Sequence, residues 1–532
     1  MAIHVGTIDV TRRTHHGTVH CFARGYGAMP AAVLDPYERL FGKTPQAPRG
    51  AAGTGSHPLY DARHNAKLLE REAEITHTFS AIEPVLREVA AMQWQDGFAE
   101  RAQAIVRERL GVTLPVHRLR ASWIAPLNMR AIYADCVFGA FLRLTEREFD
   151  RNLATLEEGE PVEELIRRWG FHAIDISPCA DGRLSGVVDY ILRIPPAVVA
   201  YRKSYAGAMF DVEESMRHWV EVELRRHREG VPNRADEPTR YLKISVYHTS
   251  SSNSEEGCAA HGSDERKAAA ALLERLNAFA SAIENAHCCG ASVATLLIGV
   301  DTDTDAIRLH VPDARGALSL ERCVDCLALF EATSRLTREN AKEAIRLAVA
   351  EAAGVELDDP ATEGMRWFCG YLLKNNMAQI EYVRTYHNGR YAELGHTERF
   401  ITVGDAFDDL QMRNLAYQAQ METIEEGAVD IDVGIKIFKK VNMARDLPIP
   451  VFVHFRYDGK VPGSRERAVQ RCRRMAQAIQ TRYSELVNEG WLYIYATIKD
   501  STPGSRLEPI DKLESASSRR CACSSNISER GT

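Results

Sequence analysis

The sequence predicts an α/β fold, α+β overall, in which an N-terminal helical domain precedes two sheet domains. Short apolar runs with β-branched residues alternate with long helical segments from about residue 161 to residue 510, which is typical of a largely parallel sheet. Residues 61–160 show only helical periodicity. A chain of 532 residues is also long enough for about three domains of roughly 150 residues each. We therefore expect domain boundaries near residues 160 and 397.

The two ends of the chain differ from this central part in composition. Residues 1–60 are rich in Gly, Pro, Ala and Thr and hold six Lys or Arg against three Asp or Glu. We expect them to form a disordered basic arm. Residues 511–532 are polar, and we expect a disordered tail there.

The overall composition excludes several classes of function. A net charge of −7 provides no basic field for a nucleic acid. No apolar run approaches the roughly 18 residues of a membrane span, and the N-terminus lacks the apolar stretch of a signal peptide. We expect a protein of the cytoplasm, with no membrane partner, whose twelve cysteines are mostly reduced.

The helical domain is predicted from the spacing of its apolar residues. A five-member helical stripe is formed by Ile75, Phe79, Ile82, Leu86 and Val89. Thr145 and Glu148 have the pattern of a capping box, which predicts that another helix begins there.

The sheet domains are predicted from apolar runs that are too short for helices. Residues 171–177, 241–248 and 292–300 read as strands. Residues 263–286 read as a long helix with Ser263 as its N-cap. In residues 398–510, short apolar runs again alternate with helical segments, which predicts a second sheet domain.

Chemistry-bearing residues gather where two of these strands end. Cys179, Asp181 and Arg183 follow the first strand, His248 ends the second, and Cys258 comes ten residues later. Two cysteines and one histidine suit a catalytic zinc, which takes three protein ligands and leaves one position for water. Ligands also bind at the carboxyl ends of strands in open α/β sheets.

The spacing alone does not decide between a metal site and an ordinary turn. In a metal site, Asp181 would accept a hydrogen bond from the bound hydroxide, and Arg183 would restrain that carboxylate through a bidentate pair. In a plain turn, Asp181 and Gly182 would be common turn residues and Arg183 a surface charge. His261 is the alternative ligand to Cys258.

The residues Cys179-Ala180-Asp181-Gly182-Arg183 resemble the Cys-x-Asp-x-Arg signature of β-type carbonic anhydrases. That family usually follows with a close His-x-x-Cys pair, whereas a longer loop separates His248 from Cys258. The departure resembles one branch, the carboxysome shell carbonic anhydrases, once called the ε class. The resemblance extends over nearly the whole chain after residue 60, including "HAIDISPCADGRLSGVVDYILRIP", "ISVYHTSS", "GHTERFITVG" and "VDIDVGIKIFKK".

The resemblance implies a zinc-dependent, reversible hydration of CO₂ to bicarbonate. It implies Cys179, His248 and Cys258 as ligands of one zinc ion per chain, with Asp181 and Arg183 as catalytic residues. It also suggests a role for His396 near the mouth of the site, although a structural histidine at a domain junction is an equal alternative. The implied location is the carboxysome in the bacterial cytoplasm, where the enzyme supplies CO₂ to Rubisco.

The resemblance further implies two β-carbonic-anhydrase-like sheet domains in a pseudo-twofold repeat, the second degenerate. We align "CADGRLSG" from Cys179 with "RYDGKVPG" from Arg456, and "YLKISVYH" with "WLYIYATI", which sets His248 against Ile498. In this alignment the second domain has lost its metal ligands.

Other candidate metal sites are weaker. Cys323 and Cys326, with His287, Cys288 and Cys289 upstream, could form a structural zinc site. However, Cys323, Cys326, Leu327 and Phe330 share a helical face, which favours packing in the core. The "DTDTD" at residues 301–305 begins like a calcium loop but lacks the required glycine and glutamate, so we reject it.

The sequence also leads us to expect binding partners, and it leaves two alternative functions open. We expect a homodimer or larger homo-oligomer, and we expect residues 1–60 to dock on Rubisco or on carboxysome shell proteins. The rivals are a shell-associated scaffold with a structural zinc, and a zinc hydrolase that uses the same hydroxide on an ester or amide.

Overall fold

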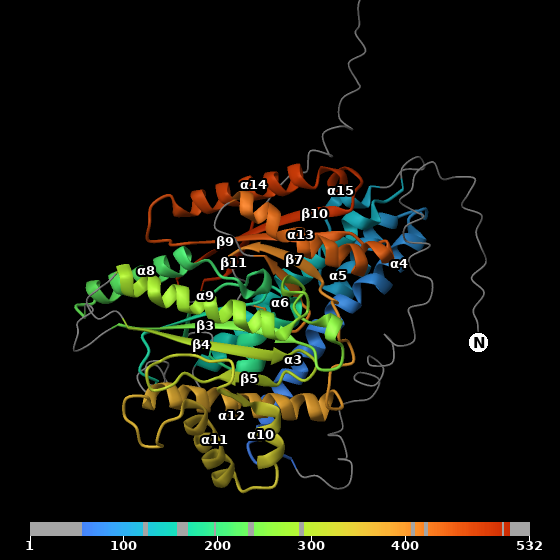
Figure 1. Cartoon of the computed structure of the whole chain (residues 1–532). Coiled ribbons are helices and arrows are strands. Elements are labelled where there is room, and N and C mark those ends of the chain that lie inside the picture. The colour runs from blue at the N-terminus through green and yellow to red at the C-terminus, as the bar shows by residue number, and fades with distance from the viewer. Residues whose placement is uncertain are drawn as a thin grey trace, which may run out of the picture.

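A computed structural model describes residues 56–120, 126–156, 169–195, 198–231, 239–286, 292–405, 410–419, 424–502 and 505–510. Within these ranges the chain forms a helical region followed by two sheets, each covered by helices (Figure 1). The predicted α/β architecture with two sheet domains is therefore confirmed. The basic arm, except for its last five residues, and the polar tail lie outside the described residues.

Within the described residues, the helical region has four long helices that share a core with the second sheet. They are α3 (Ala62–Ser80), α4 (Ile82–Met92), α5 (Phe98–Leu110) and α6 (Met129–Leu156). The predicted apolar stripe is buried and shares a core with Phe400 and Phe452 of the second sheet. The helical region is therefore a cover for that sheet rather than an independent packing unit.

The predicted helix start at Thr145 is wrong, because this residue lies in the middle of α6. The Thr145 hydroxyl donates a hydrogen bond to the Phe141 carbonyl, one turn earlier. Glu148 accepts from Arg71 Nε, 2.9 Å away, instead of from a helix terminus. The sequence pattern of a capping box cannot distinguish a cap from a helical threonine that bonds back to its own helix.

The first sheet has the strand order β2-β1-β3-β4-β5-β6. Its strands are β1 (Ala173–Pro178), β2 (Val199–Arg202), β3 (Arg240–Thr249), β4 (Ser292–Asp301), β5 (Ile307–His310) and β6 (Cys323–Asp325). The first four are parallel to one another, while β5 and β6 are antiparallel. The predicted parallel sheet is thus confirmed for the strands that precede the candidate site residues.

Helices cover both faces of this sheet (Figure 1). One face is covered by α8 (Val212–Arg228) and α9 (Glu265–Ala286), and the other by α10 (Cys326–Thr333), α11 (Arg338–Ala353) and α12 (Glu363–Tyr386). The predicted cap of α9 is displaced by one residue. Asp264, not Ser263, accepts the hydrogen bond from the backbone of Lys267, at 3.0 Å.

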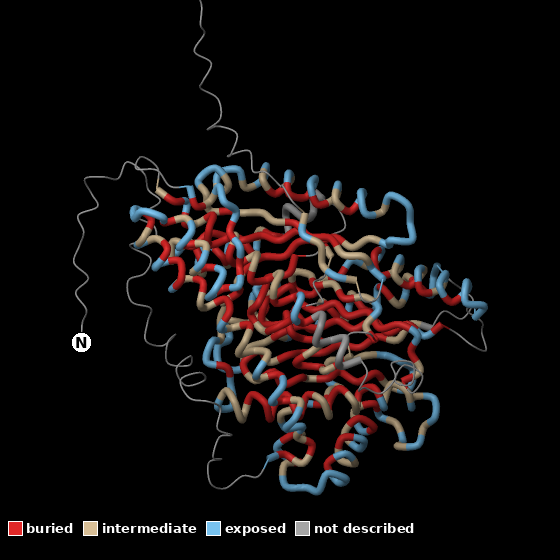
Figure 2. Tube along the Cα trace, turned by 180° about the vertical axis from the view of Figure 1, so that it is seen from behind, coloured by how far each residue is buried: buried red, intermediate tan, exposed pale blue. Residues whose placement is uncertain are grey.

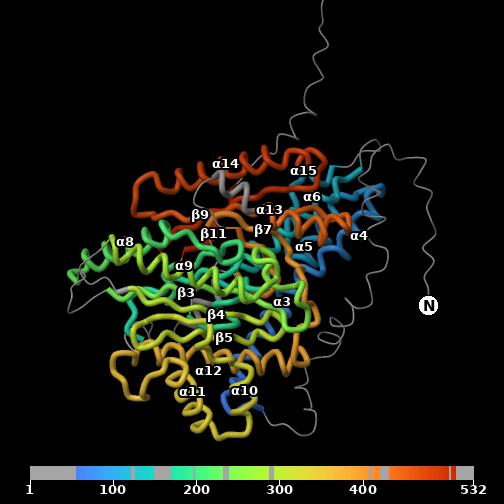
Figure 3. The backbone as a smooth tube through the Cα atoms, in the orientation of Figure 1, coloured from blue at the N-terminus to red at the C-terminus, as the bar shows by residue number. Residues whose placement is uncertain are grey.

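The second sheet repeats the topology of the first. Its strands are β7 (Phe400–Gly404), β8 (Ala416–Ala419), β9 (Ile449–Tyr457), β10 (Leu492–Asp500) and β11 (Leu507–Pro509), in the order β8-β7-β9-β10-β11. Only β11 is antiparallel to its neighbour. The connecting helices are α13 (Ile424–Val441), α14 (Ser464–Arg482) and the short α15 (Ser484–Asn488). The order β2-β1-β3-β4-β5 therefore has a direct counterpart. In the trace of Figure 3, β3, β4 and β5 of the first sheet lie below β7 and β9 of the second.

The repeat is present, but our residue alignment of it was wrong by one strand. The strand order pairs β1 with β7 and β3 with β9, not β1 with β9. An equivalent backbone hydrogen bond supports this pairing: Cys179 donates to Val246, at 3.0 Å, as Asp405 donates to His454, at 2.8 Å. Two residues after these acceptors come His248 in β3 and Arg456 in β9, so Arg456 occupies the position of His248. An Asp-Gly turn follows a strand in both domains, and this short match misled the alignment.

The two sheets meet at the turn that follows β1. Backbone hydrogen bonds run from Asn414 to Gly182, at 2.8 Å, and from Gln418 to Ala180, at 3.3 Å. Ala180 belongs to the core of the second sheet. Figure 2 shows buried residues continuing from one sheet to the other. The second domain therefore holds the turn that carries Asp181 and Arg183.

Candidate metal centre

Three buried side chains converge at the carboxyl ends of β1 and β3. Cys179 directly follows β1, His248 is the next-to-last residue of β3, and Cys258 lies in the loop between β3 and α9. Their possible ligand atoms all lie within 4.8 Å of one another. Parallel strands end at one edge of a sheet, and for this reason residues far apart in the sequence meet there.

The chemistry of this cluster suits a thiophilic cation such as zinc. The two sulfur atoms are 3.9 Å apart, and each of the three residues is at most 6% exposed. The Nδ1 atom of His248 is buried and has no hydrogen-bond partner among the described residues. Two thiolates and one imidazole are a common zinc donor set with an open fourth position.

The two thiols are electrostatically unequal. A hydrogen bond to Cys258 and burial raise the pKa of Cys179 well above its usual value. The same hydrogen bond, aided by the backbone N–H groups of Ala260 and His261, lowers the pKa of Cys258. A thiolate at Cys258 is therefore stabilised within the cluster. His261, our alternative ligand, instead places Nε2 at 3.1 Å from the carbonyl oxygen of Gly207.

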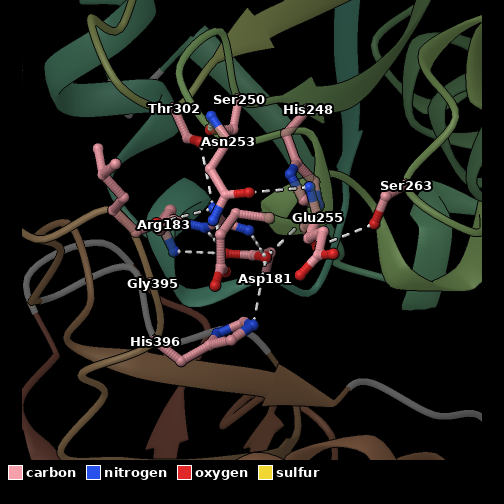
Figure 4. A network of polar contacts seen from close by, with 12 residues as sticks. Asp181, Arg183, His248, Ser250, Asn253, Glu255, Ser263, Thr302, Gly395 and His396 are labelled. Carbon is pink, nitrogen blue, oxygen red and sulfur yellow. Dashed lines mark hydrogen bonds and ion pairs between the residues drawn. The ribbon is translucent and has the colours of Figure 1, made fainter.

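Asp181 and Arg183 form a bidentate pair close to His248 of the cluster (Figure 4). Arg183 donates from Nε to Asp181 Oδ1 at 2.9 Å and from Nη2 to Oδ2 at 2.7 Å. The backbone N–H of Arg183 also donates to Oδ1, at 2.9 Å. Burial alone would raise the pKa of Asp181, but Arg183 and two nearby histidines hold it well below its usual range. Asp181 is therefore a carboxylate, and it can only accept hydrogen bonds.

The orientation of the pair leaves Asp181 Oδ2 facing two histidines. His248 Nε2 lies 3.4 Å from this oxygen and His396 Nε2 lies 3.9 Å from it. Arg183 is anchored on its far side, where Nη1 donates to the Leu394 carbonyl at 2.9 Å and to Thr302 Oγ1 at 3.3 Å. The plain-turn alternative does not fit, because the Arg183 side chain is only 1% exposed.

The aspartates of the "DTDTD" segment tie down the loop that carries Cys258. Asp303 accepts from the backbone of Ser252 at 2.7 Å and from the Ser250 hydroxyl at 3.0 Å. Asp301 accepts from the backbone of Ser251 at 3.0 Å. The segment is therefore a loop anchor, in line with our rejection of a calcium loop.

His396 is placed beside the pair by a residue that the sequence analysis missed. His396 Nδ1 lies 2.8 Å from Oε1 of Glu398, whose side chain is fully buried. The side chain of His396 is 26% exposed, so it links the buried aspartate with the surface. The only signal for Glu398 was its position two residues after a suspected histidine, within the quoted "GHTERFITVG".

The rival cysteine site does not form among the described residues. Cys326 is fully buried in α10 and its sulfur contacts the carbonyl oxygen of Leu373 at 3.5 Å, while Cys323 lies in β6. Core packing of Cys326 and Phe330 is confirmed, although Cys323 precedes the helix that we expected to contain it. His287, Cys288 and Cys289 lie outside the described residues.

This sheet, with a Cys-x-Asp-x-Arg turn and a Cys₂His cluster at its strand ends, defines the class of the protein as carbonic anhydrase. Comparisons with known proteins agree. Family models described as carboxysome shell carbonic anhydrase match residues 57–149 (N-terminal), 161–396 (catalytic domain) and 397–514 (C-terminal). The chain therefore belongs to the carboxysome shell carbonic anhydrase family.

Individual relatives carry the same name. The chain is 46% identical to the carboxysome shell carbonic anhydrase of Halothiobacillus neapolitanus over 470 residues, which is 87% of this chain and 91% of the relative. It is 46% identical to that of Prochlorococcus marinus over 477 residues, 87% of this chain and 92% of the relative. The protein from Hydrogenovibrio crunogenus is 41% identical over 472 residues, 86% and 88% of the two chains. Among the described residues, no helix is long and apolar enough to cross a membrane.

Proposed function

We propose that the chain catalyses the zinc-dependent, reversible hydration of CO₂ to bicarbonate inside the carboxysome of the bacterial cytoplasm. One observation carries the proposal: the buried Cys179, His248 and Cys258 cluster lies beside the Asp181–Arg183 pair. The family membership supports the same reaction. We propose that these three residues hold one zinc ion per chain.

Each residue of the site has a distinct part in this reaction. A bound zinc ion would lower the pKa of a water molecule from about 15.7 toward about 7, which supplies a nucleophile at neutral pH. With the metal bound, Asp181 would accept a hydrogen bond from the attacking water and so would orient it toward CO₂. Arg183 holds Asp181 by two hydrogen bonds and keeps this carboxylate from turning toward the cation. His396 lies 3.9 Å from Asp181 and is 26% exposed, so it offers a route for the reaction's proton to solvent.

The proposal extends to the direction of the reaction in the carboxysome and to the partners of the enzyme. We propose that the enzyme converts bicarbonate to CO₂ for Rubisco within the shell, and that it works as a homodimer or larger assembly. We also propose that the net positive residues 1–60 dock on Rubisco or on shell proteins. Normal packaging of a chain that lacks these residues would contradict that docking role.

Stopped-flow measurement of CO₂ hydration, before and after zinc removal by a chelator, tests the function. We expect activity in the purified chain, its loss on chelation and its recovery when zinc is added back. A scaffold with a structural zinc would give no hydration at any stage. A zinc hydrolase would cleave a test ester in a zinc-dependent way without hydrating CO₂, and either result would contradict the proposal.

A further inference from the structure

Glu398 is a buried carboxylate that the proposed reaction does not yet use. It lies two residues after His396 and two residues before Phe400, the first residue of β7. Its side chain is fully buried, Oε1 is 2.8 Å from His396 Nδ1, and Oε2 has no hydrogen-bond partner among the described residues. Burying a carboxylate is costly unless it is paired and hydrogen-bonded, and the partner of Glu398 is His396. A role in holding His396 is therefore indicated.

Gly182 has no side chain, and this leaves room for the Glu398 carboxylate. A Cβ atom at Gly182 would lie 2.3 Å from Cγ of Glu398 and 2.5 Å from its Oε1. Any residue other than glycine between Asp181 and Arg183 would therefore displace Glu398. The close approach makes the turn that carries Asp181 and the glutamate that holds His396 parts of one packed unit.

The contact with Glu398 determines which nitrogen of the neutral His396 ring carries the proton. A carboxylate accepts a hydrogen bond, so Nδ1 must be the nitrogen that carries a proton in the neutral ring. Nε2 is then left with a free lone pair, and it is this atom that lies 3.9 Å from Asp181 Oδ2. With 26% of its side chain exposed, the same ring is also open to solvent.

The charged groups around His396 have opposing effects. Burial and the nearby Arg183 lower the pKa of His396, while Asp181 and Glu398 raise it, and the pKa settles at about 9. At neutral pH the ring is thus mainly an imidazolium that can give up its Nε2 proton.

We propose that Glu398 is a positioning residue, which orients His396 so that Nε2, on the side of Asp181, exchanges the reaction's proton with solvent. In hydration, CO₂ and water give bicarbonate and one proton, which Nε2 of the neutral ring accepts and passes to a buffer base. In dehydration, the imidazolium donates that proton, and bicarbonate leaves as CO₂ and water. This inference rests on the proposed function, because it concerns the proton of that reaction.

The test is Glu398→Gln, which keeps the size of the side chain and removes its charge, with Glu393→Gln as the control. Glu393 is an exposed glutamate on the same loop, hydrogen-bonded to Thr397. We expect Glu398→Gln to keep its zinc and its KM and to lose about tenfold or more in kcat. The pH midpoint of kcat should move to lower pH, and a high concentration of imidazole buffer should restore turnover.

A purely structural role for Glu398 would not move the pH midpoint and would not allow rescue by buffer. Unchanged kcat in Glu398→Gln, or a loss that imidazole does not restore, would overturn the inference. His396→Asn separates this inference from the proposed function. If His396→Asn leaves turnover unchanged while zinc removal abolishes it, the zinc reaction stands and the role of Glu398 falls.

Discussion

Asp181 accepts three hydrogen bonds from Arg183 and faces two histidines with one carboxylate oxygen. This arrangement keeps the group ionised and restricts its rotation. Both properties are needed if the carboxylate is to orient a nucleophile without binding the cation itself.

The roles of Asp181 and Arg183 can be separated by two substitutions. Asp181→Asn should keep zinc but lose about 100-fold or more in kcat, because an amide is not the same hydrogen-bond acceptor. Arg183→Ala should release Asp181, which can then reach the cation and block the open position. Zinc content by plasma emission and stopped-flow hydration are the measurements. Near-normal turnover in both variants would contradict the assigned roles.

At this scale the sequence predicted which residues gather at the candidate site better than it predicted the residues that surround them. Cys179, Asp181 and Arg183 are close in sequence, so a resemblance could identify them together. Glu398 was missed because a glutamate beside a strand is common, and only the packing against Gly182 and the contact with His396 distinguish it. Thr302 was missed because its contact with Arg183 joins segments that are far apart in the sequence.

At the scale of elements, β1 and β3 are held together below the site by a buried ion pair. Lys243 of β3 donates from Nζ to Asp175 of β1 at 2.8 Å, and the Tyr241 hydroxyl donates to the same oxygen at 2.6 Å. Both charged side chains are 1% exposed. Burial alone would raise the pKa of Asp175, but Lys243 and His218 hold it well below its usual range.

This pair predicts a specific pH dependence of stability. Because the pKa of Asp175 is depressed in the folded state, its stabilising contribution is present above about pH 4 and is lost as the pH falls further. Asp175→Asn leaves Lys243 buried without a counter-charge and should destabilise the chain by about 3–5 kcal/mol at pH 7. The double variant with Lys243→Met should recover much of that loss.

Urea unfolding of the wild type and both variants, followed from pH 7 to pH 3, measures these differences. The difference in the free energy of unfolding between wild type and Asp175→Asn should narrow as the pH falls below about 4. If this difference stays constant from pH 7 to pH 3, the ionised Asp175 does not stabilise the folded chain as we expect.

The elements themselves were predictable where their periodicity was long. The helices of residues 62–92 and the strands β1, β3 and β4 were expected from apolar spacing, and the structure confirms them. The helix start at Thr145 failed because capping and back-bonding threonines share one local pattern. The repeat was misaligned because strand order depends on pairing between distant segments, which a short Asp-Gly match does not reveal.

At the scale of the whole molecule, one chain contains two sheets of the same topology but only one Cys₂His cluster among the described residues. In the second sheet, Asp405 and Arg456 stand where the first has Cys179 and His248. The connection from β9 to α14 is also far shorter than the loop that carries Cys258. The second sheet instead holds the turn of Asp181 in place through its hydrogen bonds to Ala180 and Gly182.

The number of zinc ions per chain tests the central claim most directly. Plasma emission spectrometry of the purified full-length protein should find about one zinc per chain. Cys258→Ser should lower the value toward zero, and Cys326→Ser, which changes a cysteine of the core, should leave it unchanged. A value near two per chain, or full zinc occupancy in Cys258→Ser, would contradict a single site formed by Cys179, His248 and Cys258.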